Sequence, residues 1–158
     1  MEFLKNLLLF LGCALVCTAC GSQQRRECPP VMSRAILTET EALRRYIDQK
    51  GIVAQEDSLG YFYTIEKPGT GPAPNPCSDV TVDYEGRLTD GTPFDAAQNI
   101  SFNLSQLITG WQMGLPKIGA GGTITLYLPP SLGYGDAATG DIPAQSILIF
   151  KIKLHRVR

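Results

Sequence analysis

The sequence has few of the residues on which most catalytic and metal centres depend. Its 158 residues include one histidine and one tryptophan. Structural zinc sites need about four Cys or His ligands, and no Cys-x-x-Cys pair follows Cys20, so we expect no metal and no cofactor. The formal net charge of −1 lacks the basic excess of a nucleic-acid-binding protein. The lone His155 alternates with Lys151 and Lys153, so we expect it to face solvent and to take no part in catalysis.

Long apolar runs are also missing. The run Leu7–Val16 has about ten residues, whereas a membrane-spanning helix needs roughly 20, and its length is typical of a signal-peptide core. Cys20 follows a small residue and precedes Gly-Ser, which resembles a bacterial lipobox, although Cys17 stands where such motifs usually have Leu. We therefore expect a signal peptide over residues 1–19 and a lipid on Cys20 that anchors the protein to a membrane. Plain secretion after cleavage near Ala19 is the alternative.

The remaining cysteines form one pair. Of the five, Cys13 and Cys17 would leave with the signal peptide and Cys20 would carry lipid. Cys28 and Cys77 are then left in an exported protein, where disulfides persist. A disulfide between them and two free thiols both remain open.

The polar segment 20–34 contains Pro-Pro and is typical of a tether. An N-terminal helical extension over residues 35–60 follows, because Leu43, Tyr46 and Ile47 share one helical face. Thr38 and Glu41 have the spacing of a capping box, and Gly51 is a plausible C-terminal stop.

The hydrophobic period changes to two beyond this helix. Alternating strands are expected near residues 61–65, 79–88, 100–104, 123–128 and 147–156, and Asp90-Gly91 predicts a hairpin. One short helix, "ITGWQMGL", ends at Pro116. These elements predict an α+β domain, in which an antiparallel sheet half-wraps the short helix and Trp111 points toward the concave face.

Three stretches then resemble a known family. "VTVDYEGRLTDGTPFD", "ITGWQMGLPKIGAGG" and "LYLPPSLGYGDAATGDIPAQSILIFKIKL" are similar to the FKBP-type peptidyl-prolyl cis-trans isomerases, in unbroken order from about residue 61 to 154. The resemblance implies an isomerase domain over 61–158, with the family's bent antiparallel sheet around one short α-helix. The lead-in before it is similar to that of exported bacterial members.

The resemblance also implies a set of site residues. As the catalytic residues we expect Asp95, Tyr134, Trp111 and Phe150, with Trp111 as the floor of a pocket and the Tyr134 hydroxyl reaching the ligand. Without the flanking match, Trp111 and Phe150 would be ordinary core, Asp95 a turn residue and Tyr134 a surface aromatic. The backbone N–H of Ile142 is expected to receive a ligand carbonyl. The substrate-binding set is Tyr84, Phe94, Phe102, Leu107, Ile108 and Ile142.

Such a pocket suits a reaction without bond cleavage. An X–Pro bond rotates over a barrier of about 18–20 kcal/mol set by amide resonance, and the twisted amide is less dipolar than the planar one. An apolar pocket therefore favours the twisted form over the planar ground state. We expect an isomerase acting on proline-containing segments of exported proteins, located in the bacterial cell envelope and facing the periplasm. A non-catalytic FKBP-fold chaperone or binding module for such segments is the alternative.

Two departures from the family pattern concern ligand preference. Ala144 follows Pro143 where a second Pro is common, and Asp136 and Asp141 bring two acids near the expected pocket mouth. The affinity for macrolide inhibitors and the preferred residue before proline therefore stay open, as do the client proteins and the oligomeric state.

Overall fold

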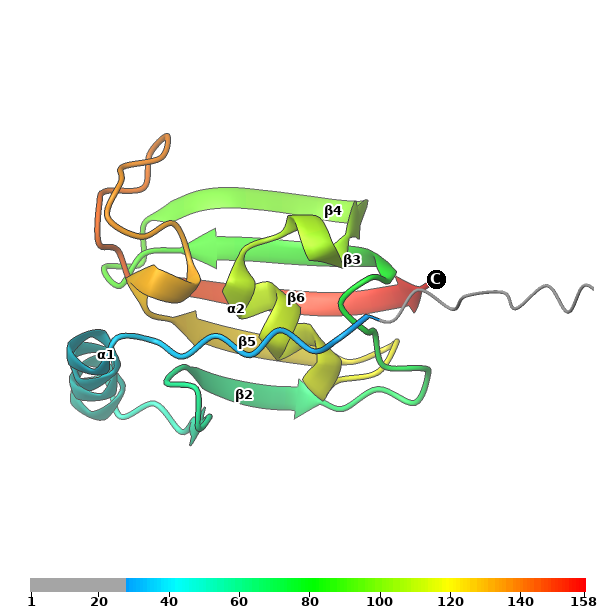
Figure 1. Cartoon of the computed structure of the whole chain (residues 1–158), viewed down its shortest axis with the longest axis horizontal. Coiled ribbons are helices and arrows are strands. Elements are labelled where there is room, and N and C mark those ends of the chain that lie inside the picture. Colours follow the sequence, from blue (N-terminus) through cyan, green and yellow to red (C-terminus); the bar gives the residue numbers. More distant parts are fainter. Residues whose placement is uncertain (1–27) are drawn as a thin grey trace, which may run out of the picture.

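The strands of residues 28–158, the part that the computed structural model describes, form one antiparallel sheet in the order β1-β2-β5-β6-β3-β4 (Figure 1). The signal peptide expected over 1–19 and the lipid on Cys20 lie outside these residues. Within them no helix is both long and apolar enough to cross a membrane. The strands are β1 Gln55–Glu56, β2 Phe62–Lys67, β3 Asp79–Arg87, β4 Pro93–Asn103, β5 Thr123–Leu128 and β6 Leu148–Val157.

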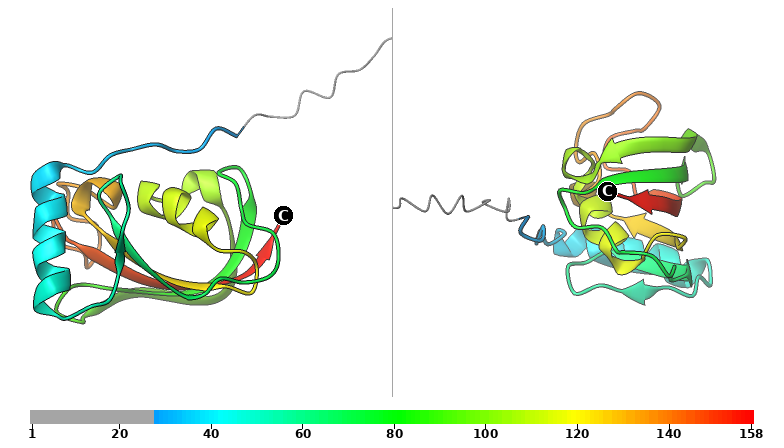
Figure 2. Two further views of the ribbon diagram at one scale, coloured as in Figure 1. Left: turned by 90° about the horizontal axis from the view of Figure 1, so that it is seen from below. Right: turned by 90° about the vertical axis from the view of Figure 1, so that its right-hand side faces the viewer.

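The short helix α2 (Thr109–Gly114) lies against one face of the sheet, as Figure 2 shows. Two glycines on its inner side allow this close approach. A Cβ at Gly110 would lie 2.4 Å from Leu128, and one at Gly114 would lie 2.5 Å from Leu126. The predicted α+β architecture, a sheet wrapped on one short helix, is confirmed. Three 3₁₀ turns flank α2 and β5 in this region: η1 Leu104–Gln106, η2 Leu115–Lys117 and η3 Pro130–Leu132.

The hairpin between β3 and β4 is confirmed at the predicted dipeptide. Gly91 has φ of +92°, and the Asp90 carboxylate accepts a hydrogen bond from the Thr92 N–H at 2.8 Å. The separate strand expected at 100–104 is instead the end of the single long strand β4. The register shifts near Asn99, whose φ is +50° and whose N–H donates to Asp83 at 2.7 Å. This bulge interrupts the alternation of the sequence without ending the strand.

Helix α1 (Leu37–Gln49) starts differently from the prediction. Ile36 is the N-cap and makes no side-chain capping bond, so the capping box expected at Thr38 was wrong. The carboxylate of Glu39 instead accepts hydrogen bonds from the backbone and hydroxyl of Ser131, at 2.9 and 2.6 Å. These bonds tie the first turn of α1 to the η3 turn, and the Ile36 N–H donates to the Ser131 hydroxyl at 3.3 Å. The C-terminal stop is confirmed, since Gly51 follows the helix with φ of +61°.

The apolar face of α1 is confirmed and covers the end of the sheet (Figure 2). Leu43 and Ile47 are buried against Phe62 and Tyr127, which belong to β2 and β5. This second cluster is separate from the main core around α2. The helical extension therefore packs onto the domain that follows it.

The Cys28–Cys77 disulfide is present, which settles the choice left open by the sequence. Residues 28–36 run along the side of α2 that faces away from the sheet (Figures 1 and 2). Val31 packs against the main core, Ala35 is buried, and the Ala35 N–H donates to the Leu59 carbonyl at 2.8 Å. The described part of the expected tether is thus fastened to the domain at several points.

Candidate active site

Trp111 lines a cavity of about 160 Å³ on the concave side of the sheet, among aromatic and aliphatic side chains. Its side chain is only 3% exposed, and α2 carries it toward strands β3 and β6. An apolar cavity of about 150 Å³ can hold one benzene-sized ring, so this one is large enough for the ring of a proline. The cavity is lined by Tyr84, Asp95, Phe102, Leu107, Ile108, Trp111, Tyr134 and Phe150.

The aromatic rings of the cavity pack edge to face. The centroids of Tyr84 and Phe150 each lie 5.3 Å from that of Trp111, with interplanar angles of 83° and 86°. Phe102 lies at 6.4 Å and 89°. Edge-to-face pairs are favoured over stacked ones, by about 0.5–1.5 kcal/mol beyond burial. The three rings therefore hold the indole in one orientation and keep the cavity open.

Phe94 supports this wall from behind. Its ring packs edge to face on Phe150 at 5.4 Å, and both rings cross Gly86, where a Cβ would lie 2.5 Å from Phe94 and 3.0 Å from Phe150. Phe94 does not line the cavity. The expectation that it forms a direct wall is therefore modified to one of support for Phe150.

Two phenols and one carboxylate form the polar rim. The Tyr84 hydroxyl donates to the Asp95 carboxylate at 2.6 Å. Burial, together with this hydrogen bond, raises the pKa of Tyr84 far above its usual range. The pKa of Tyr134 is also raised, by burial and by the charge of Asp95, although 40% of the residue is exposed. Both phenols are therefore neutral hydrogen-bond donors throughout the physiological pH range.

The backbone donor differs from the one expected. The N–H of Ile142 donates to the Thr139 carbonyl at 3.0 Å within a small hairpin, and the Ile142 side chain is buried in the core. Ile142 therefore does not present a free N–H to a ligand. Ile108 lines the cavity at the N-cap of α2, and within residues 28–158 its N–H makes no hydrogen bond. The first N–H groups of any helix lack intrahelical partners. A helix that starts near Ile108 therefore leaves a free N–H at that position.

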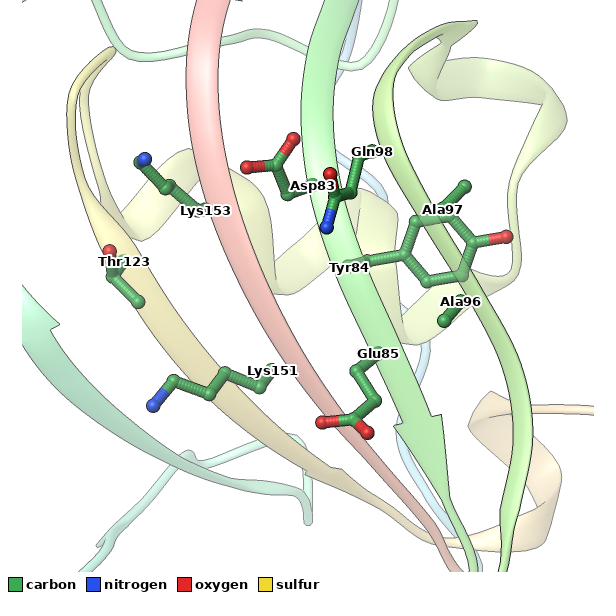
Figure 3. A pocket seen from close by; sticks show the side chains of 9 residues that line it. All are labelled: Asp83, Tyr84, Glu85, Ala96, Ala97, Gln98, Thr123, Lys151 and Lys153. Atoms are coloured by element: carbon green, nitrogen blue, oxygen red, sulfur yellow. The ribbon is translucent and has the colours of Figure 1, made fainter.

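A larger hollow, of about 830 Å³, lies on the outer face of the sheet (Figure 3). Charged side chains of β3 and β6 surround it, among them Glu85 and Lys151. Four charged side chains line this hollow, and only Tyr84 supplies an aromatic ring. His155 also lies away from the cavity and contacts Asp83 at 2.8 Å. Within residues 28–158 no group of three His, Cys, Asp or Glu side chains could hold a metal ion.

Comparison with known proteins agrees with this geometry. The sequence profile of the family described as FKBP-type peptidyl-prolyl cis-trans isomerase matches residues 71–155. The isomerase FkpA of Buchnera aphidicola (from Schizaphis graminum) is 40% identical over 121 residues, which cover 73% of this chain and 47% of the relative. FkpA of Escherichia coli K12 is 37% identical over 122 residues, covering 75% and 44%. The chain thus spans less than half the length of these two relatives.

Solved structures show the same fold. The crystal structure of FkpA from Escherichia coli matches with a TM-score of 0.68 at 36% identity, covering 77% of this chain and 58% of that one. A peptidyl-prolyl cis-trans isomerase from Pseudomonas syringae matches with a TM-score of 0.67 at 33% identity, covering 76% of this chain and 93% of that one.

Proposed function

Because the chain belongs to the FKBP-type peptidyl-prolyl cis-trans isomerases, we propose that it accelerates rotation about X–Pro bonds in exported proteins. The observation that carries this proposal is the ring-lined cavity of about 160 Å³ over Trp111. The cavity is large enough for a pyrrolidine ring and is lined mainly by apolar side chains.

The cavity can catalyse rotation without a nucleophile. Amide resonance sets a barrier of about 18–20 kcal/mol, and the resonance is lost when the bond is twisted by about 90°. The planar amide is more dipolar than the twisted one, so water stabilises the planar form more. Transfer of the bond from water to the cavity therefore raises the ground state relative to the transition state. Each 1.36 kcal/mol of this difference increases the rate about tenfold.

The residues around the cavity have separate roles in this proposal. Trp111 is the floor on which the proline ring packs. The free N–H of Ile108 and the hydroxyl of Tyr134 donate to the carbonyls that flank the proline, which fixes the peptide as the bond turns. Tyr84 and Asp95 hold each other in place through their hydrogen bond. Phe150 and Phe102 complete the wall around the ring.

An exchange measurement on a short peptide tests the proposal. The cis–trans exchange rate of acetyl-Ala-Phe-Pro-Phe-amide can be followed by NMR with catalytic amounts of protein. We expect clear acceleration by the wild type, a smaller effect for Trp111→Phe, and a loss of about tenfold or more for Trp111→Ala. Tyr46→Ala removes an aromatic side chain of the second cluster, outside the cavity, and is the matched control.

Two outcomes would reject parts of this proposal. If the wild type leaves the exchange rate at its spontaneous value, the protein is not an isomerase for this class of substrate. A non-catalytic chaperone would then be indicated if the protein aided proline-free and proline-limited refolding equally. If Trp111→Ala retained full activity, the assignment of the cavity as the active site would be wrong.

A lipid on Cys20 and a position in the bacterial cell envelope, facing the periplasm, complete the proposal. The motif around Cys20 supports the lipid, and the Cys28–Cys77 disulfide suits an oxidising compartment. The eight residue steps from Cys20 to Cys28 span at most about 29 Å, so the domain would stay close to the membrane. Metabolic labelling with a fatty acid should mark the wild type and not Cys20→Ser. Equal labelling of both would place the lipid elsewhere, and labelling of neither would favour plain secretion.

The same cavity is proposed to bind macrolide inhibitors of the family. Occupancy should change the fluorescence of Trp111, the single tryptophan of the chain, and should slow the exchange reaction in parallel. Inhibition without a change in Trp111 fluorescence would indicate a different binding site.

A further inference from the structure

Asn103 connects two parts of the chain that meet beside the cavity. It is the last residue of β4 and the N-cap of η1. Its Nδ2 donates to the Cys77 carbonyl at 3.3 Å and to the Asp79 carboxylate at 2.9 Å. Its Oδ1 accepts hydrogen bonds from the backbone N–H and the hydroxyl of Ser105. One amide side chain therefore uses both its donor and its acceptor groups, each in a different part of the fold.

The donor side of Asn103 faces a fastened loop. Cys77 is linked to Cys28 by the disulfide, and the Cys77 N–H donates to the side chain of Asn75 at 2.9 Å. Beside them the Leu104 N–H donates to the Ser78 carbonyl at 2.9 Å. The loop 75–78 is thus held both by the disulfide and by contacts with the start of η1.

The acceptor side of Asn103 leads to the cavity wall. The η1 turn is followed directly by Leu107 and Ile108, which both line the cavity. The Leu107 N–H donates back to the Leu104 carbonyl at 3.2 Å, and the Leu107 carbonyl accepts from the Gln112 side chain at 2.7 Å. The position of the free Ile108 N–H therefore depends on how η1 is held.

We propose that Asn103 is a positioning residue, which holds η1, Leu107 and the Ile108 N–H against the disulfide-fastened loop at Cys77. This inference rests on the proposed isomerase function. Asn103 does not line the cavity, so it acts only through the residues that follow it. Because those residues grip the peptide in the ground state and the transition state alike, their displacement weakens binding and leaves the turnover rate unchanged.

Two substitutions of Asn103 separate its donor and acceptor roles. Asn103→Ala removes all four contacts. Asn103→Asp keeps the acceptor for Ser105 but loses both donated bonds and sets a carboxylate beside that of Asp79. Because both variants lose the donated bonds to Cys77 and Asp79, we expect both to raise KM about three- to tenfold, with kcat within about twofold of the wild type.

The matched control is Ser101→Ala, on the same strand. It removes an exposed side-chain hydrogen bond to Thr81, 2.9 Å long, and touches neither η1 nor the loop. Its KM and kcat should equal those of the wild type. Thermal melts of all variants show whether each one is folded at the assay temperature. Titration of acetyl-Ala-Phe-Pro-Phe-amide against Trp111 fluorescence gives the peptide affinity independently of turnover.

The link to the disulfide is tested by combining variants. The double variant Cys28→Ser/Cys77→Ser should raise KM in the wild-type background. In the Asn103→Asp background it should add less than in the wild type, because the side-chain link to the loop is already lost and only the backbone bond from Leu104 to Ser78 remains. If the two effects multiply, Asn103 does not act through the loop.

The remaining outcomes are equally decisive. An unchanged KM for Asn103→Ala, or a fall in kcat with KM constant, would overturn the inference, as would the same KM rise in Ser101→Ala. If the wild type shows no isomerase activity, the proposed function fails. The peptide affinities from Trp111 fluorescence would still test whether Asn103 positions the cavity wall.

Discussion

Removal of the Cys28–Cys77 disulfide should destabilise the fold strongly, although the domain should still fold. The two cysteines are 49 residues apart in the sequence. For a loop of that length the chain-entropy description gives about 4 kcal/mol of stabilisation at 25 °C, because the crosslink removes conformations from the unfolded chain. The fastened segment also contributes native contacts through Val31 and Ala35, which the reduced protein can keep.

Thermal and urea unfolding of the wild type and of Cys28→Ser/Cys77→Ser measure this effect. For a chain of about 150 residues each kcal/mol shifts Tm by roughly 2–4 °C, so the variant should melt about 8–16 °C lower. Its denaturant m-value should rise, because an uncrosslinked unfolded chain exposes more surface.

A reductant provides the control. It should lower the Tm of the wild type to about that of the double variant and leave the variant itself unchanged. A shift of less than about 2 °C would show that loop closure in the unfolded chain is not what the disulfide restricts. Complete loss of the fold in the variant would show that the native contacts of residues 28–36 depend on the crosslink.

Two further substitutions test the wall of the cavity and an internal ion pair. Gly86→Ala should lower the folding stability by about 1–3 kcal/mol and kcat/KM several-fold, because the new Cβ would displace Phe94 and Phe150. Unchanged kinetics would show that the packing of these two rings does not shape the cavity. The pKa of Asp57 is lowered because, although burial opposes this, hydrogen bonds from Lys117 and a backbone N–H favour its charged form. A carboxyl whose pKa is lowered by folding stabilises the fold at pH values above its unfolded pKa of about 3.9. This stabilisation is lost as the pH falls from there through the lowered pKa of the folded state. Asp57→Asn should therefore destabilise the protein at pH 7 by about 1.5–3 kcal/mol, and the difference from the wild type should shrink in acid unfolding curves; a difference that does not change with pH would contradict this.

Local sequence patterns predicted which strands and which helix carry the cavity residues, whereas the grouping of these residues into one site came from the resemblance to the family. Tyr84 follows two valines at alternating positions of one strand, and Trp111 stands between helix-breaking residues in a short helical pattern. Phe102 and Phe150 also lie on faces set by strand alternation. These residues converge in the structure because the strands that carry them are held by sheet pairing and by the packing of α2.

The errors arose where distant contacts override local patterns. The start of α1 is held by Ser131, more than ninety residues away, which accepts from the Ile36 N–H and donates to Glu39; no local pattern around Thr38 indicates these contacts. The Ile142 donor was instead carried over from the family resemblance, and its N–H is used locally, in a hydrogen bond to the Thr139 carbonyl. The side-chain amide of Asn103 donates to the Cys77 carbonyl, a residue far from it in the sequence. A polar residue between a strand and a turn does not indicate such a contact from the sequence alone.

The pH dependence of kcat/KM for X–Pro exchange tests most directly whether rotation needs only a dry cavity and fixed hydrogen-bond donors. No proton is transferred in that mechanism, and the pKa values of Tyr84 and Tyr134 are raised, so both remain protonated. The profile should be flat between about pH 5.5 and pH 9, with equal rates in H₂O and D₂O. A bell-shaped profile, or a limb within this pH range, would contradict it.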